Sequence, residues 1–329
     1  MAEVTVAAPA HTPAAAADNA AFHRMLFIAM AGVLVVLPFI PVIGYPFFLM
    51  KVLCFALFAC AFNLMLGYGG LLSFGHAAYF GLASYVSAYT AKHWGLTPEL
   101  AILFGTASGA VLGLIFGSLA IRRQGIYFAM ITLALAQMVY FFSLQAPRFT
   151  GGEDGIQAVP RNKVLGLLPL SNDLVTYYLV AVIFVAGVML IYRIIHSPFG
   201  QVLKAIRDNE ARAISLGYRV NQYKLAVFVL SASLAGLAGA TKAVAVQLAS
   251  LTDVHWSMSG EVVLMTLVGG MGTVFGPIVG AAVIIAMQNF LASLGAWVTV
   301  VQGVIFVICV LVFREGIVGV IGKWLKRPL

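Results

Sequence analysis

The chain has 329 residues, of which 62% are hydrophobic and only 9% are charged, and its mean hydropathy is +1.02. Soluble domains are roughly 45–50% apolar and about 25% charged. A chain of this length with so few charges could not cover a water-exposed surface, so a soluble enzyme, a nucleic-acid-binding protein and a secreted disulfide-rich protein are excluded. The net charge of +8 therefore needs another explanation, and its distribution indicates membrane orientation.

Long apolar runs follow one another along the chain. The hydrocarbon core of a bilayer is roughly 30 Å thick and needs about 20 apolar residues per helix, whereas the strands of a membrane barrel would alternate at every second residue. The sequence predicts an all-α integral membrane protein with about ten transmembrane helices. They comprise residues 25–43, 47–66, 74–91, 98–120, 126–145, 174–195, 224–248, 259–270, 277–294 and 297–313.

The basic residues predict the orientation of these helices, because cytoplasmic loops carry an excess of Lys and Arg. With the N-terminus inside, the cytoplasmic segments contain 13 of the 19 basic residues and five of the 11 acidic residues. We therefore expect both termini inside. Residues 1–22 are expected to form a flexible cytoplasmic tail, residues 23–313 the transmembrane domain, and residues 314–329 a basic cytoplasmic tail.

Two connections are too long to be simple turns. Residues 146–173 are polar and glycine-rich, and we expect them on the periplasmic side. Residues 197–222 are basic and belong to the cytoplasmic side in this topology. Between Pro198 and Gly217 they have the periodicity of one amphipathic helix, with start and stop signals at its ends.

The charged side of this predicted helix has a regular spacing. Lys204, Asp208 and Arg212 follow one another at intervals of four residues, which allows two ion pairs on one face. Three interpretations remain open from composition alone. The helix is a solvated linker, an interfacial helix on anionic lipid, or a docking helix for a cytoplasmic partner.

Glycine recurs at every fourth position in the predicted helix 98–120. These positions are Gly105, Gly109, Gly113 and Gly117. Small residues let helix backbones approach closely in lipid, where no hydrophobic drive acts between helices. We expect a helix-packing ridge here, which is either static or able to slide when the protein opens.

Two glycine-rich segments, 67–75 and 268–277, share the spacing of their glycines around a Phe-Gly pair. Such a correspondence is typical of an internal repeat in a transporter. One hypothesis is that the helix beginning near Ser73 or Gly75 lines a substrate pathway, with its N-terminal amides facing a carboxylate. The alternative is a tight cytoplasmic hairpin.

Few polar residues interrupt the apolar runs. His76 is expected to form a structural hydrogen bond or to act in the pathway, and Glu261 lies either within the bilayer, where an acid would be functional, or at its outer rim. Lys51 and Lys242 lie near outer helix ends and can extend to the interface. Interhelical hydrogen bonds are expected at Asn63, Gln137 and Gln247.

No motif for nucleotide or metal chemistry is present. The sequence contains no GxxxxGK[ST] phosphate-binding loop, no HExxH and no Cys/His cluster. Cys54, Cys60 and Cys309 all lie in apolar runs, where they are expected to pack as small apolar residues. We therefore predict no catalytic site, no metal and no cofactor, and an ATP-driven role would require a partner.

Five stretches resemble LivM-type permeases, the membrane subunits of ABC importers for branched-chain amino acids. They are GYGGLLSFGHAAYFGLASY (67–85), RRQGIYFAMITLALAQ (122–137), FTGGEDGI (149–156), SPFGQVLKAIRDNEARAISLGYRVNQYKLAVF (197–228) and EVVLMTLVGGMGTVFGPIVGA (261–281). The resemblance runs from residue 67 to the end, with the stretches in the family's order.

The resemblance implies a multi-pass protein of the bacterial inner membrane that moves leucine, isoleucine and valine. It implies three kinds of partner: a LivH-type permease, two cytoplasmic ATPase subunits and a periplasmic solute-binding protein. The chain would also contact membrane lipid, and it would bind no nucleic acid. The amphipathic helix resembles a coupling helix that fits a cleft in an ATPase, although Gly217 lies one residue too far from Glu210 for the usual motif. The coupling residues are Lys204, Arg207, Asp208, Glu210, Arg212 and Gly217.

Other functions compete with this interpretation. Related permeases carry urea, short amides or other amino acids. An ion-coupled secondary transporter would need coupling-ion sites near the midplane, where only Glu261 is available, and a channel would need a filter ring. His76, His196 and His255 are scattered, which disfavours an enzyme.

Overall fold

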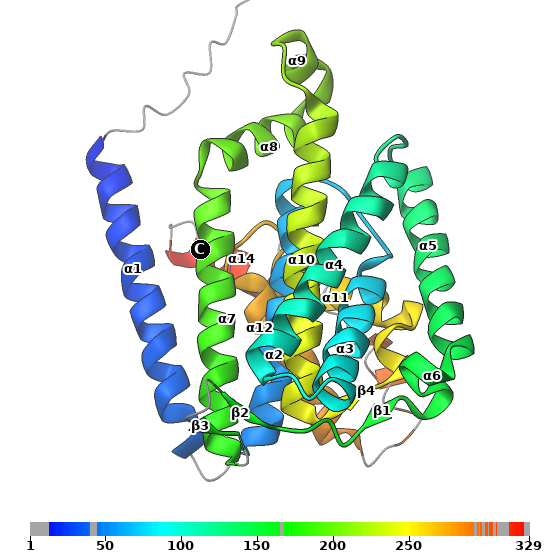
Figure 1. Cartoon of the computed structure of the whole chain (residues 1–329). Coiled ribbons are helices and arrows are strands. Elements are labelled where there is room, and N and C mark those ends of the chain that lie inside the picture. The colour runs from blue at the N-terminus through cyan, green and yellow to red at the C-terminus, as the bar shows by residue number, and fades with distance from the viewer. Residues whose placement is uncertain are drawn as a thin grey trace, which may run out of the picture.

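The computed structural model describes residues 13–39, 45–164, 168–170, 172–292 and 316–325, with single positions between 295 and 307. Helices dominate this part of the chain (Figure 1). They are α1 (Pro13–Val36), α2 (Pro46–Asn63), α3 (His76–His93), α4 (Pro98–Ala120), α5 (Ile126–Gln145), α6 (Pro147–Thr150), α7 (Asp173–Ile195), α8 (Pro198–Asp208), α9 (Glu210–Ser215), α10 (Val220–Val246), α11 (Trp256–Gly269), α12 (Gly276–Phe290) and α14 (Gly316–Leu325).

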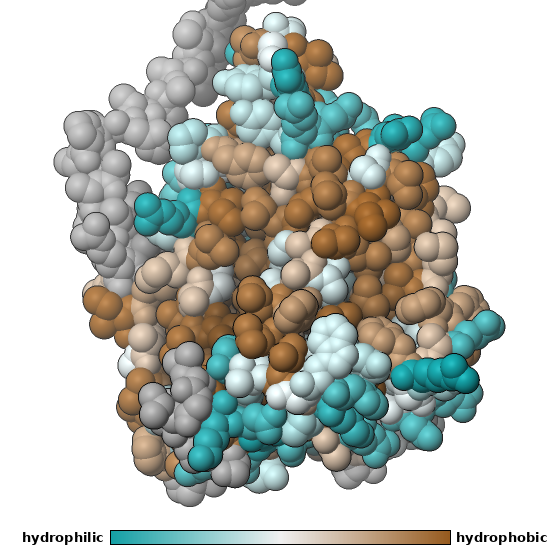
Figure 2. Space-filling view, in the orientation of Figure 1, coloured by the Kyte–Doolittle hydropathy of each residue, from teal (hydrophilic) through white to brown (hydrophobic). Residues whose placement is uncertain are grey.

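Short strands lie at the end of the molecule opposite α8 and α9 (Figure 1). Strand β1 (Ile156–Gln157) pairs antiparallel with β4 (Leu248–Ala249), and β2 (Lys163–Val164) pairs with β3 (Leu168–Pro169). We call these two regions the strand end and the α8–α9 end. Figure 2 shows a hydrophobic belt between them, with hydrophilic side chains gathered at both ends.

Five of the described helices are long and apolar enough to span a membrane. They are Pro46–Tyr68, Pro98–Ala120, Ile126–Gln145, Asp173–Ile195 and Val220–Val246. Two shorter apolar helices cover Met25–Phe39 and Gly276–Phe290. The predicted class of an all-α, multi-pass membrane protein is confirmed, whereas the count of ten spans and the inside location of both termini stay predictions.

Several boundaries differ from the sequence-based ones. Helix α1 begins at Pro13, so residues 13–22, which we expected in a flexible tail, are helical. The short predicted span 259–270 extends back to Trp256 in α11. Most of the predicted span 297–313 lies outside the described residues, as do the chain ends at 1–12 and 326–329 and the residue Cys309. The other two cysteines, Cys54 and Cys60, are buried as expected.

Helices α2 and α10 form the centre of the molecule. In their most apolar stretches, 83% and 78% of residues are buried, against 39%, 28% and 44% in α4, α5 and α7. An apolar helix that is buried all round must be covered by other helices, and α10 packs against α2, α3 and α4. The peripheral helices therefore present the exposed apolar surface that lipid or a partner would cover.

The glycine ridge of α4 faces α10. A Cβ placed on Gly109 would lie only 3.0 Å from the carbonyl oxygen of Ala232 and 3.0 Å from the Cα of Gly236. The neighbouring ridge residues are more crowded still, because a Cβ would lie 2.6 Å from Ala240 on Gly105 and 2.4 Å from Ala232 on Gly113. The ridge is therefore a close helix–helix contact, and its sliding stays a prediction.

The substitution Gly109→Leu should force α4 away from α10. Overpacking of this kind typically destabilises by about 1–3 kcal/mol, so the thermal unfolding midpoint of the purified protein should fall. The matched control is Val111→Leu, because Val111 lies on the same helix with 58% of its side chain exposed. Equal midpoints for the two variants would contradict the packing assigned to the ridge.

Candidate functional site

The basic connection 197–222 folds as two helices, α8 and α9, whereas the sequence predicted one continuous helix. The hydroxyl of Ser197 accepts from the N–H of Gly200 (3.3 Å) at the start of α8. Asn209 interrupts the helix because its backbone is extended and its Oδ1 accepts from the N–H of Arg212 (3.0 Å). An Asn side chain favours such an N-cap over a helix interior.

The ion pairs predicted at four-residue spacing do not form. Asp208 instead accepts from Arg207, at 2.9 Å from Nη2 and 3.1 Å from Nε. Arg212 lies on the separate helix α9 and is exposed. Lys204 holds its ammonium 5.5 Å from the centre of the Tyr68 ring. Burial lowers the pKa of Lys204; the charge of Arg207 lowers it further, and that of Asp208 opposes the shift.

Arg207 joins α8 to the glycine-rich segment that follows α2. Its Nη1 donates to the carbonyl oxygen of Gly67 at 2.5 Å. A Cβ on Gly70 would lie 2.8 Å from the Cγ of Arg207, and Gly70 has a φ of +68°, which favours glycine. The segment begins as a π-helical turn, Leu64–Tyr68, a form often found at functional sites. Arg207 is therefore in direct contact with this segment from α8.

Asn63 links the two glycine-rich segments. Its Nδ2 donates to the carbonyl oxygen of Thr273 at 2.8 Å, and its Oδ1 accepts from the N–H of Gly272 at 3.0 Å. A Cβ on Gly67 would lie 2.7 Å from the backbone nitrogen of Gly272, so the two backbones approach closely. The expected hydrogen bond of Asn63 thus goes to the turn between α11 and α12 and not to a facing helix.

The two segments begin their following helices in a similar way. Before α3, the N–H of Gly75 donates to the hydroxyl of the buried Ser73 at 3.1 Å. At the start of α12, the N–H of Gly276 donates to the hydroxyl of Thr273 at 3.0 Å. This local likeness agrees with the repeat suggested by the glycine spacing.

Three backbone amides at and just before the start of α3 already have partners. The N–H of Phe74 donates to the hydroxyl of Thr132 in α5 (3.2 Å), and the N–H of Ala77 donates to the hydroxyl of Ser259 in α11 (3.0 Å). Together with the bond made by Gly75, these contacts occupy the groups that one hypothesis assigned to a substrate carboxylate. In this conformation the three amides are not available to a ligand.

His76 is fully buried between α2, α3 and α10. The hydroxyl of Ser231 donates to the carbonyl oxygen of Ala61 at 2.5 Å. A hydroxyl has one hydrogen, so His76 donates from Nε2 to Ser231 at 2.9 Å. The rings of Phe62 and Tyr79 pack edge-on against the imidazole. The arrangement is the structural hydrogen bond that the sequence favoured, and a gating role stays a prediction.

Glu210 connects α9 to α10 and to the turn between α4 and α5. Its Oε2 lies 2.8 Å from the Nζ of Lys224, whose side chain is 6% exposed, and its Oε1 accepts from Gln124 at 2.9 Å. Gly217 ends α9 with a φ of +87° and donates its N–H to the carbonyl of Ile214 (2.9 Å). The partners of Glu210 cannot be inferred from the local sequence pattern, because Gln124 and Lys224 lie far from it along the chain.

Lys242 is buried and ion-paired, in contrast to the interfacial position predicted for it. Its Nζ lies 2.6 Å from Oδ2 of Asp253, which is buried as well, and it also donates to the carbonyl of Leu248 at 3.3 Å. Burial of a charge is strongly unfavourable without a partner, which explains the pairing. Asp253 was not singled out because it lies in the short turn Leu251–Asp253 and not in an apolar run.

Glu261 lies half-buried on α11, where its Oε2 accepts from Gln288 of α12 at 3.1 Å. The side chain of Lys51 is close enough to interact electrostatically with it. Among the residues that the structure describes, the side chain of Gln137 makes no hydrogen bond, so the interhelical bond expected there does not form. The carboxylate of Glu261 is therefore partly buried and hydrogen-bonded, as expected within the bilayer, and partly exposed, as expected at the outer rim.

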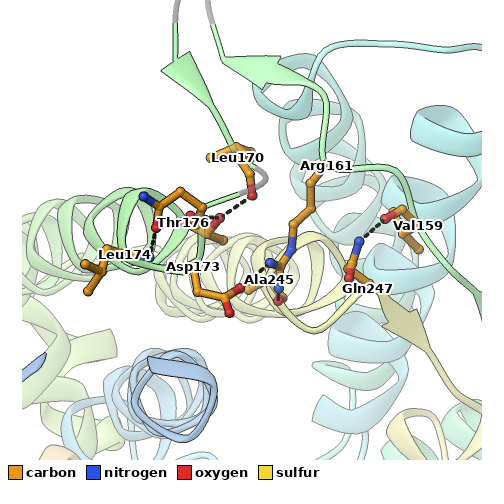
Figure 3. Close-up of polar contacts among 9 residues, drawn as sticks. Val159, Arg161, Leu170, Asp173, Leu174, Thr176, Ala245 and Gln247 are labelled. Carbon is orange, nitrogen blue, oxygen red and sulfur yellow. Dashed lines mark hydrogen bonds and ion pairs between the residues drawn. The ribbon is translucent and has the colours of Figure 1, made fainter. Parts of the chain in front are cut away.

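Arg161 bonds the long connection between α5 and α7 to the start of α7 and to the end of α10 (Figure 3). Its Nη1 lies 2.6 Å from Oδ1 of Asp173 at the start of α7, and its Nη2 donates to the carbonyl of Ala245 near the end of α10. Gln247 donates to the carbonyl of Val159 at 3.1 Å, and the N–H of Val159 donates back to the carbonyl of Gln247 at 3.2 Å. Gln247 therefore holds this connection and not a neighbouring helix.

The chain is similar to known permease proteins along most of its length. The family described as the permease component of branched-chain amino acid transport systems matches residues 45–310. The chain is 24% identical to the high-affinity branched-chain amino acid transport system permease protein LivM of Salmonella typhimurium and to LivM of Escherichia coli, each over 94% of this chain and 79% of the relative.

A third relative is a LivH-type permease. The chain is 25% identical to the probable branched-chain amino acid transport permease protein LivH of Methanocaldococcus jannaschii, over 78% of this chain and 86% of that protein. No solved structure matches the chain. The family match begins one residue before α2 and covers most of the sequence, including both glycine-rich segments and the α8–α9 connection. The chain therefore belongs to the family of permease components of branched-chain amino acid transport systems.

Proposed function

We propose that this chain is the membrane-spanning subunit of an ABC importer that moves leucine, isoleucine and valine across the bacterial inner membrane, driven by separate ATPase subunits. The observation that carries the proposal is the hydrogen bond from Arg207 to the carbonyl of Gly67, in a chain of this family. It connects a projecting basic loop to glycine-rich backbone within the helical body. The sequence contains no phosphate-binding loop, so the ATPase has to be another subunit.

The proposed topology has ten spans, with both termini in the cytoplasm. The α8–α9 end then faces the cytoplasm and carries residues 197–222, and the strand end faces the periplasm and carries residues 146–173. The excess of basic residues at the first end supports this orientation. The remaining partners are a LivH-type permease beside this chain in the lipid, a second ATPase and a periplasmic solute-binding protein.

Two contacts would transmit the motion of a docked ATPase. Arg207 joins α8 to the segment before α3, and Glu210 joins α9 to Lys224 in the central helix α10. A shift of α8 would displace the segment that leads to the start of α3. Ser73, Gly75 and His76 belong to the proposed pathway because they lie at this helix start, and Glu261 belongs to it on the neighbouring α11.

The function is tested by uptake of radioactive leucine into proteoliposomes. Uptake should require the ATPase subunits, the second permease, the solute-binding protein and ATP together, because this chain supplies no energy of its own. Unlabelled isoleucine and valine should compete for uptake, and urea and acetamide should not. Uptake by this chain alone under a proton or sodium gradient would show a secondary transporter instead and contradict the proposal.

Arg212→Glu should weaken ATPase association. Arg212 is exposed on α9 and has a free face toward a cytoplasmic partner, unlike Lys204 and Arg207, which contact this chain. In this proposal the basic loop meets an acidic surface of the ATPase, so a glutamate at position 212 would bring like charges together at a cost of several kcal/mol, and co-purified ATPase should fall more than roughly tenfold. Arg148→Glu, an exposed arginine in α6 near the strand end, is the matched control. Equal recovery of ATPase with both variants would show that α9 is not its docking site.

Arg207→Gln should uncouple transport from ATP hydrolysis and leave assembly intact. A hydrogen bond to a charged group contributes about 1.5–3 kcal/mol, so loss of the Gly67 contact should lower leucine uptake per ATP hydrolysed roughly tenfold. The measurement is the ratio of uptake to phosphate release in proteoliposomes. Arg219→Gln is the control, since Arg219 is exposed in the same connection. An unchanged ratio in the Arg207 variant would remove this residue from the coupling route.

A further inference from the structure

A groove lies between the end of α4 and the start of α10. It has a volume of about 230 Å³ and is lined by Gly117, Ser118, Ile121, Arg122, Asn221 and Leu225. The helices meet below it because Gly117 has no side chain: a Cβ there would lie 3.0 Å from Leu225 and 2.9 Å from Phe228. The last glycine of the α4 ridge thus forms one wall of an opening at the α8–α9 end.

The groove crosses the border between apolar and polar surface. Gly117 and Ser118 belong to the membrane-spanning stretch of α4, whereas Arg122 lies just beyond its end. The exposed apolar side chains of Leu114, Ile115 and Leu119 continue the wall of α4, each 51% exposed. Figure 2 shows the hydrophobic belt giving way to hydrophilic side chains at this end of the molecule. A ligand here would meet hydrocarbon-like surface at one end and charge at the other.

Arg122 brings an uncompensated positive charge to the groove. Within the described part of the chain it forms no ion pair, and the groove has no acidic lining residue. Glu210 is connected to the same turn through Gln124, but its other oxygen is paired with Lys224. The groove therefore selects an anion, and the guanidinium plane suits the oxygens of a phosphate.

We propose that this groove binds an anionic phospholipid of the leaflet at the α8–α9 end. Arg122 donates to the phosphate, Asn221 hydrogen-bonds to the headgroup, and an acyl chain lies along Leu225 and the exposed side of α4. Basic pockets between transmembrane helices are suited to such headgroups. The lipid would wedge between α4 and α10 beside the Glu210 contact, so the leaflet's composition would influence the α8–α9 end whatever the cargo is.

The test is native mass spectrometry of the purified full chain titrated with palmitoyl-oleoyl phosphatidylglycerol or with the corresponding phosphatidylcholine. The wild type should bind phosphatidylglycerol in preference. Arg122→Gln should weaken that binding about fivefold, since one basic residue near an anionic surface contributes about 1 kcal/mol. Arg123→Gln, the exposed neighbour outside the groove, should change it less than about twofold. Ser118→Phe, which fills the groove without changing charge, should also lower it.

Three outcomes would overturn the proposal. An equal loss in the Arg122 and Arg123 variants would show only general surface attraction. Displacement of phosphatidylglycerol by millimolar glycerol 3-phosphate would show a site for a soluble phosphate and not for a lipid. Unchanged phosphatidylglycerol binding by both Arg122→Gln and Ser118→Phe would show that the lipid does not bind in this groove. Unchanged helical circular dichroism and unfolding midpoints establish that the variants are folded.

Discussion

Close approach of helix backbones without side chains between them is the constraint on which this structure depends. Lipid offers no hydrophobic drive to hold helices together, so van der Waals contact must replace it. The central helix α10 meets α4 through Gly109 and Gly236, and it meets α3 where Gly239 lies against the backbone of Phe80. The same device brings Gly67 against Gly272 in the glycine-rich segments. Close glycine contacts therefore hold together both the central helices and the segments of the proposed coupling route.

Charged and polar groups fix the two ends of this centre. At one end Lys224 of α10 is paired with Glu210, and at the other Lys242 of the same helix is paired with Asp253. Breaking a buried pair by removing one partner is far more costly than losing a surface pair. The Arg161 contacts add a further tie at the strand end. Helix α10 is thus held along its length and at both ends, which suits a fixed element against which others move.

The sequence predicted helix positions and the face of one helix, and it missed contacts between residues that are brought together by folding. Apolar length located the helices, and the four-residue glycine spacing located the contact face of α4. The single helix predicted over the basic connection was wrong because periodicity does not register the cap formed by Asn209, although an Asn before Glu-Ala-Arg is a recognisable start signal. Lys242 was misplaced for another reason, since an ion pair with Asp253 cannot be inferred from helix position alone.

The start of α3 is the weaker point in this assembly. The amides of Phe74, Gly75 and Ala77 at this helix start donate to the hydroxyls of Thr132, Ser73 and Ser259, and a neutral hydrogen bond of this kind contributes only about 0.5–1.5 kcal/mol. Each of them is therefore easier to release than either ion pair at the ends of α10. Arg207 acts on the segment that leads to this helix start. In the proposed mechanism, a pull on α8 would reach these amides through Arg207 before it disturbed α10, and the released amides would then face the substrate carboxylate.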